Sequence, residues 1–147
     1  MNADGFWQSV DCFADDAFKF QSAFAEVQNN LGLALGQLGR RDEAIAAFRD
    51  AARLMPASSK IHNNLAKALW QSGQKEEALA AFRQALATDP SPSSAQVHND
   101  YGVALATLGR VPEAVAQFQD AVRLRPDFAE ARANLARALG MMGRERP

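Results

Sequence analysis

The chain repeats itself, and this repeat limits its fold more than any other feature. One set of seven residues occurs first as Leu31, Leu35, Gly39, Ala44, Phe48, Ala51 and Pro56. The first position of the set recurs at Leu65, Tyr101 and Leu135, so successive copies are 34, 36 and 34 residues apart. The set is complete three times, and the fourth copy shows its first three members only, ending at Gly143. Periods of this length are typical of helical units that stack on one another.

Each copy predicts a pair of antiparallel helices. In the first copy, Leu31, Leu35 and Leu38 lie at positions i, i+4 and i+7, which predicts one buried helical face. Gly39 follows, at a point where a helix needs a residue with positive φ in order to end. In the second helix, alanines let the two helices approach closely around Phe48, and a proline then turns the chain. Two such helices cannot bury both apolar stripes alone, so each pair must stack on the next.

The repeat predicts an all-α chain of five segments. They are an N-terminal aromatic helix that caps or docks (1–24), three helix pairs (25–58, 59–92 and 95–128) and a C-terminal half-repeat or capping helix (129–147). The two extra residues before the third pair fall in the turn-rich stretch 89–94. In the last segment we expect a helix over about 129–142, with Leu135 and Leu139 facing inward and Gly143 as the turn.

The N-terminal segment contains five of the nine phenylalanines. Helical spacing predicts an amphipathic helix over residues 4–20, and its apolar positions are Phe6, Trp7, Val10, Phe13, Ala14 and Ala17. One interpretation is a degenerate second helix of an earlier repeat, packing as a cap. The other is a docking or dimerisation helix, because so many aromatic side chains exceed what capping one helix pair requires.

Composition excludes several classes of function. The formal net charge is −1, so no basic excess is available to hold a nucleic-acid backbone. Cys12 is the only cysteine, which excludes an internal disulfide and a cysteine-rich metal site. No apolar run approaches the roughly 20 residues of a membrane span, and the N-terminal residues do not read as a signal peptide. We therefore expect a cytoplasmic protein with no cofactor, no bound metal, no nucleic acid and no membrane partner.

The repeated residues resemble the tetratricopeptide repeat (TPR) family over residues 25–143. Leu31-Gly32 and Tyr101-Gly102 match the family's Leu-Gly pair. The chain departs from the family where a tryptophan is common, at Gln28, His62, His98 and Arg132. The resemblance implies a right-handed solenoid in which the first helix of each pair lines a concave groove. Such grooves usually bind an extended peptide or a partner helix.

A polar ladder is predicted along that groove. The residues directly before the first position of each copy are Asn30, Asn64, Asp100 and Asn134. An amide both donates and accepts, so it binds a peptide group regardless of sequence. The pattern is similar to the asparagine ladder of TPR arrays of the O-GlcNAc transferase type. Asp100 cannot donate and favours an amine there; the alternative is that all four residues bond within the repeat.

Further candidate peptide-binding residues share the same predicted face. Trp70 stands where other copies have small residues and would form an apolar anchor, although it would equally fill space beside the next helix. The remaining candidates are the preceding amides and two cations: Asn29, Asn63, Asn99, Lys67 and Arg137. The two cations would hold acidic side chains, or are solvated surface charge.

Two specific ligands are disfavoured by the sequence. The carboxylate clamp of heat-shock-chaperone TPR adaptors matches poorly, because Asn29, Leu33, Gln96 and Asp100 stand where that clamp has Lys, Asn, Lys and Arg. A metal pair formed by His62 and His98 lacks a third ligand at suitable spacing, so packing histidines are the better interpretation.

No catalytic motif is present in the sequence: it contains no P-loop, GxGxxG or nucleophile elbow. The sequence therefore predicts a noncatalytic module that binds a protein or peptide in the TPR groove. One alternative is a self-assembling scaffold, a homo-oligomer that uses its open solenoid ends. The other is the substrate-binding arm of a larger enzyme.

Overall fold

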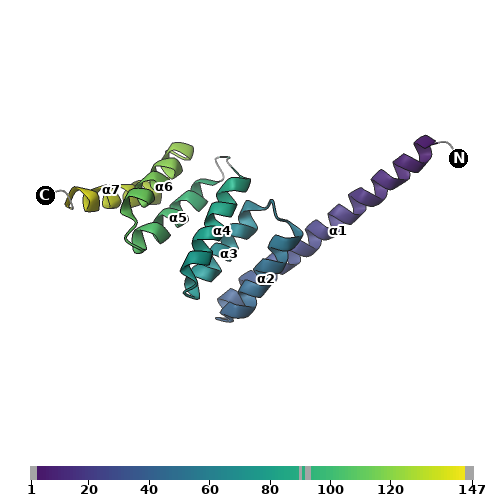
Figure 1. Ribbon diagram of the computed structural model, residues 1–147, viewed down its shortest axis with the longest axis horizontal. Coiled ribbons are helices and arrows are strands. Elements are labelled where there is room, and N and C mark those ends of the chain that lie inside the picture. The colour runs from purple at the N-terminus through teal and green to yellow at the C-terminus, as the bar shows by residue number, and fades with distance from the viewer. Residues whose placement is uncertain (1–2, 90, 92–93, 145–147) are drawn as a thin grey trace. The chain divides into compact units, whose positions relative to one another are not determined.

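The computed structural model describes residues 3–89, 91 and 94–144, without the side chains of residues 3–14 and 144. Within these residues the chain forms seven α-helices and no strand (Figure 1), so the predicted all-α class is confirmed. The helices are α1 (Ala3–Gln37), α2 (Arg41–Leu54), α3 (Ser59–Gln71), α4 (Lys75–Thr88), α5 (Ala95–Thr107), α6 (Val111–Leu124) and α7 (Ala129–Arg144). They form two compact units, residues 1–57 with α1 and α2, and residues 58–147 with α3 to α7.

A glycine connects the two helices of each complete pair. Gly39, Gly73 and Gly109 have φ of 77°, 85° and 76°, a conformation that glycine adopts without steric cost. The residue after each glycine donates its N–H to a carbonyl five residues earlier, as Arg40 does to Leu35 at 3.0 Å. This is the bond that closes a helix ending in a left-handed residue. The predicted turn glycines are confirmed at these three positions.

A phenylalanine from the second helix fills the centre of each complete pair. Phe48, Phe82 and Phe118 are 2–3% exposed. The first helix lies directly on the ring, since a Cβ added at Gly102 would be 2.6 Å from Phe118, and one at Gly32 would be 2.7 Å from Phe48. Small residues at these positions therefore set how closely the paired helices approach.

Within the second unit, consecutive pairs stack as the repeat predicts. The rings of Phe82 in α4 and Tyr101 in α5 stack with centroids 5.7 Å apart, and α7 packs against α6 and α5. The connection from α4 to α5 spans residues 89–94, two more than the connections 55–58 and 125–128. The extra length of the third copy thus lies between helices, as expected.

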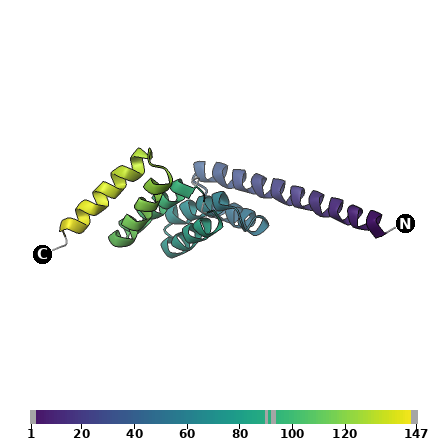
Figure 2. The same ribbon diagram turned by 90° about the horizontal axis from the view of Figure 1, so that it is seen from above.

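The N-terminal helix is longer than predicted. The helix expected over residues 4–20 is the first part of α1, which runs unbroken for 35 residues and extends far beyond α2 (Figure 2). No proline or glycine lies between Phe20 and Ala25, so nothing in the sequence ends the helix there. The side chains of Phe6, Trp7, Val10, Phe13 and Ala14 lie outside the described ones; Ala17 is exposed.

Three other expectations are wrong. Leu31 and Leu38, expected in the core with Leu35, are 46% and 72% exposed, whereas Leu35 is 8% exposed. Leu139 is 47% exposed, and Gly143 lies inside α7 rather than at a turn. For the three leucines the reason is a missing neighbour: in its unit α1 packs on α2, and α7 packs mainly on α6, with a smaller contact on α5. No helix within the described residues is long and apolar enough to cross a membrane.

Candidate functional site

The second unit has a pocket of about 200 Å³ between its first helices, here called the α3–α5 pocket. Its lining residues come from α3, α4, α5 and α7 and are Lys67, Trp70, Gln71, Phe82, Asp100, Val103, Ala104 and Glu130. Three residues predicted from sequence as peptide-binding, Lys67, Trp70 and Asp100, thus line one pocket. The pocket combines an apolar wall with opposite charges, which suits an amphipathic side chain of a partner.

Asp100 is the polar centre of this pocket. Its Oδ1 accepts a hydrogen bond from Gln96 Nε2 at 2.9 Å, and its Oδ2 lies 3.5 Å from Lys67 Nζ in an ion pair. Oδ2 is nevertheless buried and accepts no hydrogen bond within the described residues. The side chain of Asp100 is 16% exposed, whereas that of Lys67 is 52% exposed. A carboxylate so placed retains acceptor capacity for a donor that enters the pocket.

Trp70 lines the α3–α5 pocket with its indole ring. Its side chain is half-buried, and Lys75 Nζ lies 5.6 Å from the ring centroid. A cation at that distance is attracted by the ring quadrupole and holds the indole in place. Val103 and Ala104 of α5 line the pocket with it. This arrangement supports a rigid apolar anchor point for a ligand.

A second pocket of about 220 Å³, the α5–α7 pocket, shares Val103 with the first. It is lined by Val103, Ala106, Thr107, Phe118, Asn134, Arg137, Ala138 and Met141. Asn134 and Arg137, both predicted from sequence, therefore lie together here. Since the two pockets meet at Val103, the first helices of the second unit carry one continuous candidate surface.

Asn99 does not lie on that surface, contrary to prediction. It is fully buried at 0% exposure, and its Nδ2 donates to Glu130 Oε1 at 3.0 Å. Its Oδ1 accepts from Asn134 Nδ2 at 3.0 Å, so one predicted ladder residue is bonded to this buried side chain. The reason is that α7 lies against α5, and the amide one residue before the ladder position faces this neighbour. Asn99 links α5 to α7.

The other predicted amides are not gathered in one place. Asn29 is 3% exposed and Asn30 is exposed, and both belong to the first unit. Burial removes Asn29 from the surface on which it was expected. Asn63 and Asn64 are half-buried in α3 and line neither pocket, and Asn63 Oδ1 is buried without a hydrogen bond within the described residues. Of the four ladder positions, Asp100 and Asn134 lie in adjoining pockets.

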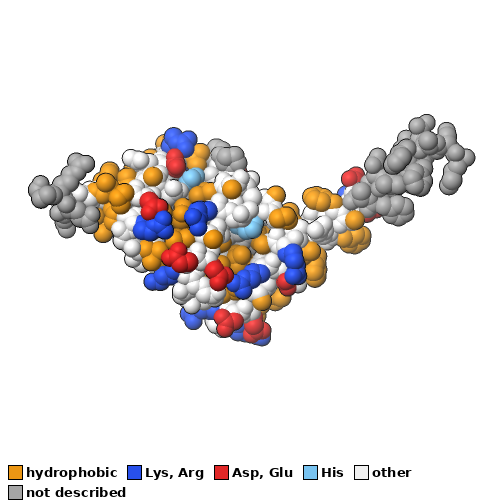
Figure 3. Space-filling view, viewed as in Figure 1, with side chains coloured by type: hydrophobic (Ala, Val, Ile, Leu, Met, Phe, Trp, Pro, Cys, Tyr) orange, Lys and Arg blue, Asp and Glu red, His pale blue; other side chains and the backbone are white. Residues whose placement is uncertain are grey.

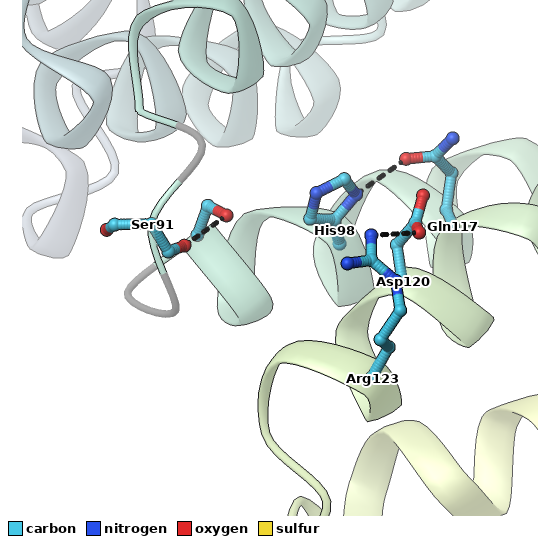
Figure 4. A network of polar contacts seen from close by, with 6 residues as sticks. Ser91, His98, Gln117, Asp120 and Arg123 are labelled. Atoms are coloured by element: carbon cyan, nitrogen blue, oxygen red, sulfur yellow. Dashed lines mark hydrogen bonds and ion pairs between the residues drawn. The ribbon is translucent and has the colours of Figure 1, made fainter.

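The two histidines have packing environments. His98 Nδ1 lies 2.9 Å from Gln117 Oε1, which joins α5 to α6 beside the Arg123–Asp120 ion pair (Figure 4). His62 is 9% exposed in α3. Among the residues that the structure describes, no group of three His, Cys, Asp or Glu side chains could hold a metal ion.

The pKa values that shift belong to exposed ion pairs outside both pockets. The pKa of Glu43 is lowered, mainly by the hydrogen bond from Arg40, and that of Glu113 is lowered in the same way by Arg110. The guanidinium Nε and Nη2 of Arg110 donate to the two oxygens of Glu113 at 2.7 and 2.6 Å. These pairs lie at the start of second helices and stabilise local structure rather than a binding site.

Sequence reasoning missed the aromatic floor of the pockets. Phe82 lines the α3–α5 pocket and Phe118 lines the α5–α7 pocket, although both were predicted only as core. Their recurrence 36 residues apart was visible in the sequence. In the second unit, each of the two complete helix pairs thus has a pocket that its central phenylalanine lines.

The fold and the site define a helical-repeat protein whose first helices carry adjoining pockets. The family model described as Tetratricopeptide repeat matches residues 29–91 and 63–127. Because these matches span more than half of the chain, the chain belongs to the tetratricopeptide repeat family. No match was found among curated proteins.

Solved TPR structures share this fold. The Arabidopsis OM64 TPR domain is 22% identical, covers 82% of this chain and 98% of its own, and has a TM-score of 0.76. The first TPR of Spaghetti (RPAP3), bound to an HSP90 peptide, is 22% identical over 83% of this chain and 95% of its own, with a TM-score of 0.77. Pseudomonas aeruginosa PilF is 27% identical over 84% of this chain and 55% of its own, with a TM-score of 0.74.

Proposed function

We propose that this chain is a noncatalytic interaction module that binds an extended peptide segment of a partner protein across α3, α5 and α7. The observation that carries the proposal is the buried Oδ2 of Asp100, which accepts no hydrogen bond within the described residues. Lys67 Nζ lies 3.5 Å from Oδ2 in an ion pair that lacks hydrogen-bond geometry, so a ligand that donates directly to Oδ2 gains a charge-assisted hydrogen bond. The adjoining Trp70 supplies apolar contact in the same pocket.

The proposal also draws on the family. Two similar TPR structures contain bound peptides, one from HSP90 and one from HSP70. In those two proteins a TPR domain binds a peptide, which supports a peptide ligand for this chain. For this chain the pocket residues suggest a different ligand chemistry, since an acidic side chain lies at the centre of the pocket.

The pocket chemistry defines the ligand we expect. A lysine or arginine of the peptide donates to Asp100, taking the place of Lys67 beside the carboxylate, and the methylene stem or an apolar neighbour lies on Trp70. Asn134, which lines the adjoining α5–α7 pocket, offers its Oδ1 to a backbone N–H of the peptide, because its Nδ2 donates to Asn99. Lys67, released from Asp100, is then available to an acidic residue of the same peptide.

The experiment is a selection of random peptides displayed on phage against the full chain. We expect enrichment of peptides with a basic residue next to an apolar one. Synthetic copies are then titrated against Trp70→Ala and Asp100→Asn, and each substitution should weaken binding at least about 10-fold, since hydrogen bonds to charged groups contribute about 1.5 to 3 kcal/mol.

Asp120→Asn is the matched control, because Asp120 is an aspartate of α6 outside both pockets and pairs with Arg123. It should leave the affinity unchanged. Selected peptides that bind Asp100→Asn and Trp70→Ala as tightly as the unchanged chain would overturn the proposal, as would a selection that enriches no peptide.

A further inference from the structure

An apolar stripe runs along α1 without a partner in its unit. The large side chains Phe20, Phe24 and Val27 are 78%, 54% and 60% exposed. Leu31 and Leu38 continue the line at 46% and 72%. Figure 3 shows such hydrophobic side chains exposed along α1 next to the undescribed ones. Together with the exposed Ala17 and Ala34, these five residues are called the α1 stripe.

The spacing of the α1 stripe is that of a coiled coil. Its positions advance by alternating steps of three and four residues from Ala17 to Leu38, and in the sequence the same steps continue back through Phe13, Val10 and Phe6. Apolar residues that repeat every 3.5 positions keep one seam facing a partner helix. At about 100° per residue, this seam lies about a third of a turn from the face that packs on α2.

The corresponding face of α5 shows that the repeat normally buries this surface. Val97, Tyr101 and Ala104 follow Val27, Leu31 and Ala34 by 70 residues and are only 5%, 7% and 3% exposed. They are covered by α4 of the preceding pair, where Phe82 stacks on Tyr101. The α1 stripe is therefore a contact surface, but its unit contains no helix that covers it in the way that α4 covers α5.

The length of the stripe selects the partner. In the sequence, the apolar spacing of the stripe extends from Phe6 to Leu38, which is 33 residues or about 50 Å of helix. A second helix of the repeat has 14 residues and covers only about 21 Å. A helix as long as α1 is needed to cover the seam, and α1 of a second copy has this length and the same apolar spacing.

We propose that two copies of this chain associate through their α1 stripes as an antiparallel coiled coil. The five large described side chains expose on the order of 500 Å² per copy, given about 200 Å² for a full aromatic side chain. A stable interface buries about 800 Å² per partner. In the sequence the same apolar spacing continues toward Phe6, so α1 has further positions for the interface.

Side-chain size decides the orientation. In an antiparallel pair centred near Ser22, Phe24 meets Phe20 of the second copy, and Ala17 meets its Val27. In a parallel pair each residue faces the same residue of the second copy. The layers formed by Ala17 and Ala34 would then leave gaps, whereas the phenylalanine layers would be overpacked. Cores are packed at uniform density, which favours the antiparallel layers.

Charge favours the same orientation. Residues 1–24 contain four aspartates and one lysine. A parallel pair would bring these acidic segments side by side, whereas an antiparallel pair places them at opposite ends. Like charges held close together destabilise a helix pair. The antiparallel arrangement avoids this repulsion because it keeps the two acidic segments apart.

The test is the mass of the full chain by sedimentation equilibrium across a range of protein concentrations. We expect a dimer of twice 15.9 kDa, that is 31.8 kDa. Phe24→Glu, in the seam, should raise the dissociation constant at least about 100-fold, because it buries an unpaired charge. Phe18→Glu is the matched control on the same helix, since Phe18 is 66% exposed but lies off the stripe, and it should remain dimeric.

Orientation is measured with spin labels on Cys12, the only cysteine. In the antiparallel pair Cys12 lies level with residue 32 of the second copy, so the two labels are about 30 Å or more apart. Labels within about 20 Å would overturn the antiparallel arrangement. A monomer at all concentrations, a mass that grows without limit, or a dimer unaffected by Phe24→Glu would overturn the pairing itself.

Discussion

The helices α1 and α5 occupy the same place in the repeat but bury the same face to very different extents. Tyr101 of α5 is 7% exposed and stacks on Phe82, whereas Leu31, its counterpart in α1, is 46% exposed. On the face toward the second helix the two agree, because Gly32 and Gly102 both lie against a central phenylalanine. The repeat thus specifies which faces are apolar, and the presence of a neighbouring helix decides whether each face is buried.

The largest expected difference between α1 and α5 is in the stability lost when Leu31 or its counterpart Tyr101 is replaced by alanine. Tyr101→Ala should lower the free energy of unfolding by about 3 to 5 kcal/mol, since it leaves a void between α4 and α5. Leu31→Ala should lower it by less than about 1 kcal/mol, because its side chain is half in solvent. Urea unfolding at low protein concentration, where the chain is monomeric, measures both. Equal losses would mean that the face of α1 is covered within one chain.

The pair-level fold was predictable because its signals are local. Gly39, Gly73 and Gly109 mark turns through their own backbone requirement, and Phe48 marks the centre of a pair through its small neighbours. These features depend on a few adjacent residues. The spacing of the copies then predicted stacking in the second unit, which α4 and α5 confirm.

The predictions that were wrong concern residues whose burial depends on neighbouring helices, which the sequence of a single repeat does not reveal. Asn99 was predicted to face a ligand, but α7 lies against it and takes both its donor and its acceptor. Leu38 was predicted in the core, and its face has no covering helix in the first unit. Lys67, Trp70 and Asp100 were predicted to share one face and do line one pocket, whereas Phe82, which also lines it, was predicted only as a core residue.

A second prediction concerns the face that α1 and α5 each turn toward the second helix of their pair, which is buried in both. A Cβ at Gly36 would meet nothing within 4 Å, so Gly36→Ala should stabilise α1 by up to about 1 kcal/mol through helix propensity. Gly32→Ala gains the same propensity, but its Cβ would lie 2.7 Å from the Phe48 ring, which must move. We expect Gly32→Ala and Gly102→Ala to be neutral or destabilising.

Thermal unfolding of the three variants provides the measurement. Ala66 occupies the equivalent position in α3 and is fully buried, so the fold accommodates this methyl group after a small adjustment. We therefore expect a higher melting temperature for Gly36→Ala than for Gly32→Ala or Gly102→Ala. A stabilising effect of Gly102→Ala equal to that of Gly36→Ala would show that the ring moves freely and that the close approach is not a constraint.

The smallest expected effect concerns the arginine–glutamate pairs that begin α2 and α6. The hydrogen bonds from Arg40 and Arg110 lower the pKa of Glu43 and of Glu113 in the folded chain. A carboxylate with a lowered folded pKa stabilises the fold above its unfolded pKa, and this contribution is lost as pH falls through the lowered value. Both pairs are exposed, so the effect is small and is weakened by salt.

Arg110→Gln should return the pKa of Glu113 toward its ordinary value and leave that of Glu43 unchanged, as followed by NMR titration of the side-chain carboxyl groups. Arg40→Gln should return the pKa of Glu43 toward its ordinary value and leave that of Glu113 unchanged. Glu113 should keep a small lowering of its pKa after Arg110→Gln, because Arg83 also lowers it, whereas the only cation that lowers the pKa of Glu43 among the described residues is Arg40. Equal residual pKa shifts of Glu43 and Glu113 in the two variants would mean that only the local pair acts on each carboxyl group. A residual shift confined to Glu113 would show that these pairs differ as the faces of α1 and α5 do, through neighbours rather than through local sequence.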